Sequence, residues 1–194
     1  MDQQQMQMVK ERLSVLEGQQ LRYVFRSMDM VCFEFGNIVT KKVFGRDENG
    51  KPTWVEESAG EYALHLQCSF RIVRDDHIVL AKNDMFQPST DYLGSHSLDE
   101  SNDIPDDFDY DQRGANRMDE ILSTTFLELN GFFIASIQMM KTGDLNLVFR
   151  NGFQLNVFVD VSGDVECWRF FRANHDDTHL VVTAEGLMID DGSI

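Results

Sequence analysis

The stretch GDLNLVFRNGFQLNVFVD, residues 143–160, decides the fold that we predict for this chain. Two runs of alternating apolar residues flank Asn151 and Gly152, which is typical of a β-hairpin. A two-residue loop would place the apolar sets of the two strands on opposite faces. A three-residue loop with a left-handed Gly152 instead pairs Leu147 with Leu155 and gives one apolar face. We therefore predict the three-residue form, with a G1 bulge.

Alternating apolar residues predict further strands on the N-terminal side of this hairpin. Short runs within residues 21–35 predict two strands or one broken strand. The cleanest alternation, over residues 62–72, predicts one half-buried antiparallel strand, with its partner at residues 78–81. Gly, Asn, Pro and charged residues over 45–60 predict a loop, with Trp54 folded back onto the body of the protein.

Helical spacing of apolar residues predicts two α-helices. The first covers residues 3–17, and the second covers about 117–130 with Asn116 as its N-cap. Strand patterns resume at residue 132 and continue to residue 183. We therefore predict a single α+β domain, residues 1–194, with these two helices and a largely antiparallel β-sheet of about eight strands.

The chain is strongly acidic, with a formal net charge of −16 and a pI near 4.5. This charge argues against binding to nucleic acid phosphates and against an anionic membrane surface. The N-terminal segment does not resemble a signal peptide, and no apolar run is long enough to span a bilayer, so we expect a cytoplasmic protein. Cys32, Cys68 and Cys167 lie far apart in apolar runs, which favours buried thiols over disulfides.

Residues 84–116 are rich in acidic side chains and are predicted to form a long loop. Loops of this length inside a domain are uncommon and are usually functional or mobile. The carboxylates would attract a basic protein partner and accelerate its association. The candidate partner-binding residues are Asp103, Asp106, Asp107, Asp109 and Asp111.

One part of this segment resembles a calcium-binding loop. Asp107, Asp109 and Asp111 occupy the first, third and fifth positions of that pattern. The pattern then fails, because Gln112 and Met118 stand where it requires Gly and Glu. A solvated or partner-facing acidic loop is the interpretation that we prefer.

Other reactive residues also lack the arrangement that their chemistry requires. His175 and His179 have the spacing of a zinc pair, but they are predicted to lie in a turn and not on a helix. His65 and Cys68 would lie on opposite faces of one strand, which argues against a nucleophile pair. We therefore predict no metal, no cofactor and no catalytic residue.

A polar pocket is the alternative site. His65 and Arg71 belong to the polar face of the predicted strand, and Asp84 follows the end of its partner strand. These three side chains could bind a small molecule or, in an enzyme, a substrate. Whether the chain is an enzyme stays open at this point, although the lack of a recognisable catalytic motif favours a binding protein.

Several segments resemble a family of uncharacterised bacterial cytoplasmic proteins. They are SMDMVCFEFG (27–36), EYALHLQCSFRI (61–72), the D-x-x-x-P step from Asp84 to Pro88, DDFDYDQRGANRMDE (106–120), and GDLNLVFRNGFQLNVF (143–158) through ECWRFF (166–171). The family tends to have Pro-Trp where this chain has Ser69-Phe70. Some relatives resemble immunity proteins encoded beside bacterial toxins. The resemblance thus implies a non-enzymatic, immunity-type inhibitor that binds a basic partner, such as a toxin, through the acidic loop.

Overall fold

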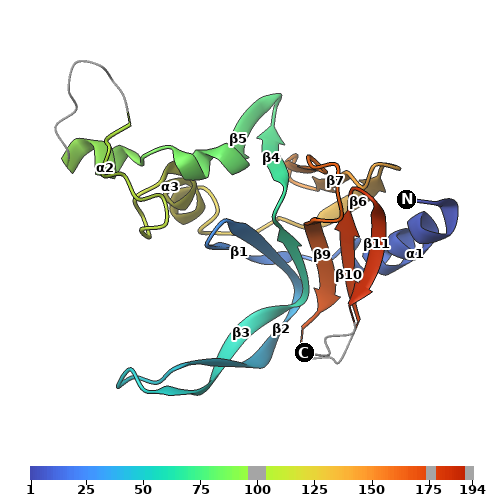
Figure 1. Ribbon diagram of the computed structural model, residues 1–194, viewed down its shortest axis with the longest axis horizontal. Coiled ribbons are helices and arrows are strands. Elements are labelled where there is room, and N and C mark those ends of the chain that lie inside the picture. The colour runs from blue at the N-terminus through green and yellow to red at the C-terminus, as the bar shows by residue number, and fades with distance from the viewer. Residues whose placement is uncertain (96–103, 174–177, 191–194) are drawn as a thin grey trace.

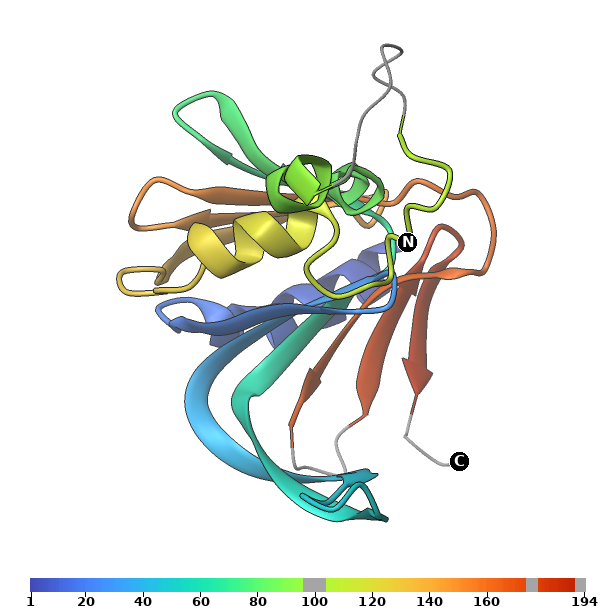
Figure 2. The same ribbon diagram turned by 90° about the vertical axis from the view of Figure 1, so that its left-hand side faces the viewer.

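The computed structural model describes residues 1–95, 104–173 and 178–190. These residues form eleven strands in two antiparallel sheets, three α-helices and two short 3-10 helices (Figures 1 and 2). The predicted α+β class with antiparallel sheet is confirmed. The prediction of about eight strands and two helices is corrected, because the described residues hold more strands, a second sheet and a third helix.

The first sheet has six strands in the order β1-β2-β3-β9-β10-β11. Its strands are β1 Leu21–Ser27, β2 Met30–Arg46, β3 Pro52–Leu66, β9 Glu166–Arg172, β10 His179–Thr183 and β11 Gly186–Asp190. The sequence pattern does not predict β11. Its apolar residues Leu187, Met188 and Ile189 are consecutive, and the last two are exposed, so the strand has no alternating pattern.

The second sheet has five strands in the order β5-β4-β8-β7-β6. Its strands are β4 Ser69–Arg74, β5 His77–Ala81, β6 Ile134–Met139, β7 Leu145–Phe149 and β8 Gln154–Phe158. The predicted form of the β7–β8 hairpin is confirmed. Leu147 pairs with Leu155, Gly152 has a φ of +87°, and the backbone N–H of Phe149 donates to the carbonyl of Phe153 at 2.8 Å.

The single strand predicted over residues 62–72 is wrong, because the chain passes from one sheet to the other within it. Gln67 and Cys68 separate β3 from β4, and their backbone N–H groups both donate to the carbonyl of Cys167, at 2.8 and 3.0 Å. Leu66 and Phe70 are nevertheless both buried in one core. The apolar alternation therefore continues across a break in the sheet.

The loop predicted over residues 45–60 is also wrong. β2 and β3 remain paired beyond the ends of their neighbours and form a two-stranded arm, residues 38–58, which extends away from the rest of the sheet (Figure 1). Only the turn at its tip is irregular, where Asp47 accepts backbone hydrogen bonds. Trp54 does not fold back onto the body, because it is 66% exposed and packs edge-on against Phe44.

The N-terminal helix is shorter than predicted. α1 spans Gln3–Leu13 and is followed by a 3-10 turn, η1, over Ser14–Leu16. Asp2 caps the helix, since its side chain accepts a hydrogen bond from the backbone N–H of Gln5. Val9 and Leu13 are buried and add one helical face to the core.

The remaining helices lie next to the acidic part of the chain. A 3-10 helix η2, Lys82–Phe86, and helix α2, Thr90–Ser95, occupy part of the predicted loop over 84–116. Helix α3, Arg117–Thr124, is capped by Asn116 as predicted, but it ends earlier than residue 130. The hydroxyl of Thr124 donates to the carbonyl of Glu120, and such local bonds accompany the poor helix propensity of a Ser-Thr-Thr run.

The core lies between the two sheets and α1. Phe33 of β2 packs edge-on against Phe70 of β4, with the ring centroids 5.9 Å apart. Trp168 and Phe170 of β9 are buried, and Trp168 Nε1 donates to the carbonyl of Gly143. The three cysteines are buried and free, as predicted. Within the described ranges, no helix combines the length and apolar character needed to cross a bilayer.

Candidate functional site

The acidic part of the chain folds against β1 and α3. Asp106, Asp107, Asp109 and Asp111 are all exposed. Asp103, which is predicted to belong to the same group, lies outside the described residues. The described segment 104–116 therefore presents four exposed carboxylates. Their relative positions depend on the contacts beneath the segment.

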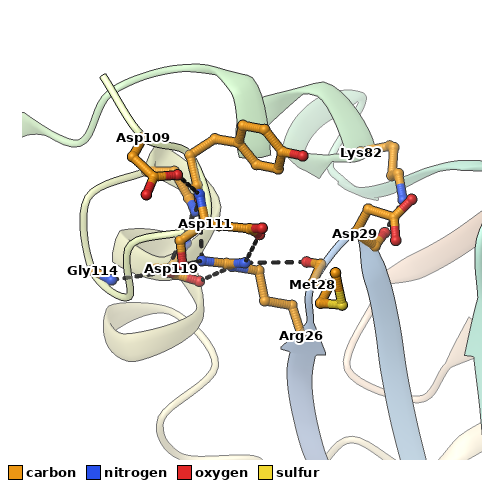
Figure 3. Close-up of polar contacts among 10 residues, drawn as sticks. Arg26, Met28, Asp29, Lys82, Asp109, Asp111, Gly114 and Asp119 are labelled. Atoms are coloured by element: carbon orange, nitrogen blue, oxygen red, sulfur yellow. Dashed lines mark hydrogen bonds and ion pairs between the residues drawn. The ribbon is translucent and has the colours of Figure 1, made fainter. Parts of the chain in front are cut away.

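Arg26 of β1 holds this segment in place (Figure 3). Its Nε donates to Oδ1 of Asp119 at 2.8 Å, and its Nη2 donates to Oδ2 at 3.1 Å, which makes a bidentate ion pair. Nη1 also donates to Oδ1 of Asp111, and Nη2 donates to the carbonyls of Tyr110 and Asp111. The hydrogen bond to Asp119 raises the pKa of Arg26 despite desolvation, and only 8% of this side chain is exposed.

Asn116 and Asp119 complete the support. Asn116 is fully buried, and its Nδ2 donates to the carbonyl of Tyr110 at 2.8 Å while its Oδ1 accepts from the backbone N–H of Asp119. Oδ2 of Asp119 also accepts from the backbone N–H of Gly114 at 2.8 Å. The cap of α3, the turn before it and β1 thus share one hydrogen-bond network.

Aromatic residues fasten the acidic segment to the helices before it. The ring of Tyr110 lies edge-on to Phe86 of η2 at 5.1 Å, and the ring of Phe108 lies edge-on to Tyr92 of α2 at 5.3 Å. The sequence does carry a signal for this, because the aromatic residues at 108 and 110 alternate with aspartates at 107, 109 and 111. The prediction of a long loop overlooks that signal.

The three aspartates of the calcium-like pattern have separate partners. Asp109 accepts from the backbone N–H of Asp111, Asp107 accepts from the hydroxyl of Tyr92, and Asp111 pairs with Arg26. In the described part of the chain, no group of three or more His, Cys, Asp or Glu side chains could hold a metal ion.

The predicted histidine pair is described only in part. His179 stacks on Phe171 with the ring centroids 4.2 Å apart, whereas His175 lies outside the described residues.

A groove of about 1040 Å³ opens between β1 and α3, beside Arg26. A smaller depression of about 420 Å³ shares Asp91, Arg113 and Gly114 with it, so the two form one continuous surface. Acidic and apolar side chains both line the groove. Its acidic residues are Asp91, Asp111, Asp119 and Glu120, and its apolar residues are Val24, Phe25, Met28, Leu122 and Leu127.

We call the exposed or half-exposed carboxylates of segment 104–116 and of the walls of these depressions the acidic surface. Its members are Asp91, Asp106, Asp107, Asp109, Asp111 and Glu120. Arg26 neutralises charge below this surface, and Arg113 is a basic residue on its exposed side. The surface is therefore suited to cationic side chains.

The three residues of the alternative pocket lie in different surroundings. His65 lies on β3 in the first sheet, whereas Arg71 lies on β4 in the second sheet, with its guanidinium over the ring of Phe158. Asp84 forms an ion pair with Arg117 at 3.6 Å. No hydrogen bond or ion pair joins these three residues in the described chain, and none of them lines the groove.

The surroundings of His65 lower its pKa. Burial lowers the pKa of His65 to about 4, and the nearby positive charges of Arg169 and Lys41 act in the same direction. Its ring packs edge-on against Phe171 at 4.9 Å. These contacts describe a neutral histidine packed into the sheet.

The fold and the site define an α+β protein with two antiparallel sheets and an acidic surface that a buried arginine holds in shape. No family model, no curated protein and no solved structure gives a significant match to this chain. The function is therefore inferred from geometry and charge.

Proposed function

We propose that this chain is a non-enzymatic binding protein that captures a basic segment of a partner protein on its acidic surface, as an immunity-type inhibitor would. One observation carries the proposal. Arg26 fixes the acidic segment through Asp119, Asp111 and two carbonyl groups, while Asp106, Asp107 and Asp109 form no ion pair with any described residue. The negative charge is thus held in a defined shape before a partner arrives, which reduces the entropy lost on binding.

The groove adds a second kind of contact. Met28 and Leu127 are 70% and 75% exposed, and both line the groove beside the acidic surface. Large apolar side chains left in water favour association with an apolar partner surface. A basic segment that also carries apolar side chains therefore matches both features, with charge guiding the encounter and apolar contact prolonging the complex.

The resemblance to proteins encoded beside toxins suggests which partner to test first. If the chain is an immunity-type inhibitor, a neighbouring gene encodes a toxin with a basic surface. The product of that gene should bind the purified chain and lose its toxicity. A product that does not bind would contradict the immunity-type part of the proposal.

The role of the acidic surface is tested with a charge-removal variant and a matched control. The variant carries Asp106→Asn, Asp107→Asn and Asp109→Asn. The control carries Asp75→Asn, Asp76→Asn and Asp164→Asn, which removes three exposed charges from turns elsewhere. We expect the association rate at low salt to fall roughly tenfold for the variant and to change little for the control.

The apolar contribution is tested separately. Leu127→Ala should mainly accelerate dissociation, whereas Ile78→Ala, at an exposed site outside the groove, should change neither rate. Equal association rates for the two Asn variants would contradict a role of the acidic surface in binding the partner. An unchanged dissociation rate for Leu127→Ala would contradict an apolar contact between the partner and the groove.

A further inference from the structure

The two-stranded arm, residues 38–58, is the least covered part of the first sheet. β1 pairs with β2 only as far as Phe35, and β9 pairs with β3 only from Tyr62 onward. Beyond these points the two strands have only each other as sheet neighbours within the described chain. A two-stranded ribbon is marginally stable alone in water, so such an arm gains stability from a surface that covers it.

One face of the arm carries large apolar side chains in solvent. Phe44 and Trp54 are directly opposite each other in the pairing of β2 with β3, and they are 67% and 66% exposed. Ile38, which is 58% exposed, lies on the same face because strand side chains alternate with a period of two. We call this side the outer face of the arm, with Ile38, Lys42, Phe44, Trp54 and Glu56 as its residues.

The charges of the arm differ from those of the whole chain. Residues 38–58 contain four basic and four acidic side chains, so the arm is neutral although the chain has a net charge of −16. A second copy of such an acidic chain is repelled least at its neutral part. On the outer face, Lys42 lies opposite Glu56, and neither forms an ion pair within the described chain.

We propose that the outer face of the arm docks on the same face of a second copy of this chain, with a two-fold axis along the arm. This axis places β2 of one copy over β3 of the other. Lys42 of each copy then faces Glu56 of the other, and Phe44 faces Trp54 of the other. The patch is therefore complementary to itself, as the interface of a symmetric dimer must be.

Edge-to-edge pairing of two arms fits the charges less well. A symmetric pairing of β2 with β2 would bring together Lys41, Lys42 and Arg46 of both copies. A symmetric pairing of β3 with β3 would bring together Glu56 and Glu57 of both copies. Like charges placed opposite each other are destabilising, so face-to-face docking is the symmetric arrangement that the charges favour.

The test uses charge exchange between two variants. By sedimentation velocity at about 100 μM, the unmodified chain should be a dimer. Lys42→Glu alone and Glu56→Lys alone should each weaken the dimer by roughly tenfold or more, because like charges then face each other at two places. An equimolar mixture of the two variants should sediment as a dimer again. In the mixed dimer, the carboxylate introduced at position 42 of one chain faces the ammonium introduced at position 56 of the other, and the unchanged Glu56 faces the unchanged Lys42.

Recovery of the dimer in the mixture distinguishes a lost interface from a folding defect in the single variants. A variant whose own arm is destabilised by like charges at positions 42 and 56 cannot be repaired by a second variant unless the two chains touch there. A monomeric unmodified chain, a dimer unaffected by either substitution, or a mixture that stays monomeric would each overturn the proposal.

Fluorescence gives an independent measurement. The chain has two tryptophans, and Trp168 is fully buried while Trp54 is exposed. Acrylamide should quench Trp54 more strongly on dilution, as dimers dissociate and uncover it. Quenching that does not depend on protein concentration over the range where sedimentation shows dissociation would place the interface elsewhere and overturn the proposal.

Discussion

The guanidinium of Arg26 and the carboxylate of Asp119 make a two-point contact, with Nε to Oδ1 at 2.8 Å and Nη2 to Oδ2 at 3.1 Å, although the residues are 93 positions apart in sequence. The contact joins β1 to the first turn of α3. It therefore fixes the acidic surface relative to the first sheet.

Arg26→Lys should reduce the free energy of unfolding by about 2–4 kcal/mol. Lysine keeps the charge but cannot reproduce the fork of hydrogen bonds, and it leaves Asp119, which is 13% exposed, incompletely paired. Urea unfolding measures the loss, and amide hydrogen exchange over residues 107–116 should become faster. Arg74→Lys is the control, because the Arg74–Asp75 pair is largely in solvent and should contribute almost nothing. Similar losses for both variants would contradict the role of Arg26.

Gly60→Ala should destabilise the base of the arm by about 2–3 kcal/mol. A Cβ at Gly60 would lie 2.6 Å from the backbone N of Phe35 and 2.8 Å from atoms of Glu34. The backbone N–H of Gly60 also donates to the buried carboxylate of Glu34 at 2.8 Å, so any shift disturbs that bond. Gly163→Ala, where a Cβ meets no atom within 4 Å, should change the free energy of unfolding little. Thermal or urea unfolding distinguishes the two.

His65 should make stability depend on pH between about 4 and 6.5. Its pKa is lowered from 6.5 to about 4 in the folded chain, mainly by burial. Between these values the unfolded chain binds more protons, so the free energy of unfolding falls as the pH falls through this window. The loss should reach up to about 3 kcal/mol at the lower end.

The control for this prediction is His65→Gln, which cannot titrate. The stability difference between the unmodified chain and this variant should change across the window, while the carboxylates titrate equally in both proteins. A constant difference, or a titration of His65 near 6.5 followed by NMR, would contradict the prediction.

The three cysteines should react slowly with a thiol reagent in the folded chain. Burial raises the pKa of Cys32 and Cys68 to about 12, and burial also raises the pKa of Cys167. Only the thiolate is the nucleophile, so both low access and low ionisation suppress the reaction. All three thiols should react promptly in denaturant, and rapid labelling of the folded chain would contradict the burial.

Local patterns predicted the elements whose conformation neighbouring residues decide. The bulged turn at Gly152 follows from the need to keep Leu147 and Leu155 on one face, and the cap of α3 follows from the side chain of Asn116. These outcomes depend on a few adjacent side chains and on backbone sterics.

The errors arose where a distant partner decides the conformation. The turn between β2 and β3 has the composition of a loop. The strands on either side of it contain charged residues, which interrupt the apolar alternation that would have predicted them. The apolar alternation over residues 62–72 indicates that these side chains are buried in one core. It does not indicate that they belong to one sheet, so it could not predict that the chain passes between the sheets at Gln67 and Cys68.

The sequence alone determined the α+β class, the excess of negative charge, the burial of its cysteines and the register of the β7–β8 hairpin, because composition and side-chain periodicity act locally. Only the tertiary structure decided the division into two sheets, the uncovered arm and the position of Arg26 beneath the acidic surface. Those features depend on which segments, distant in the chain, bury their apolar faces together, and no local pattern specifies that choice.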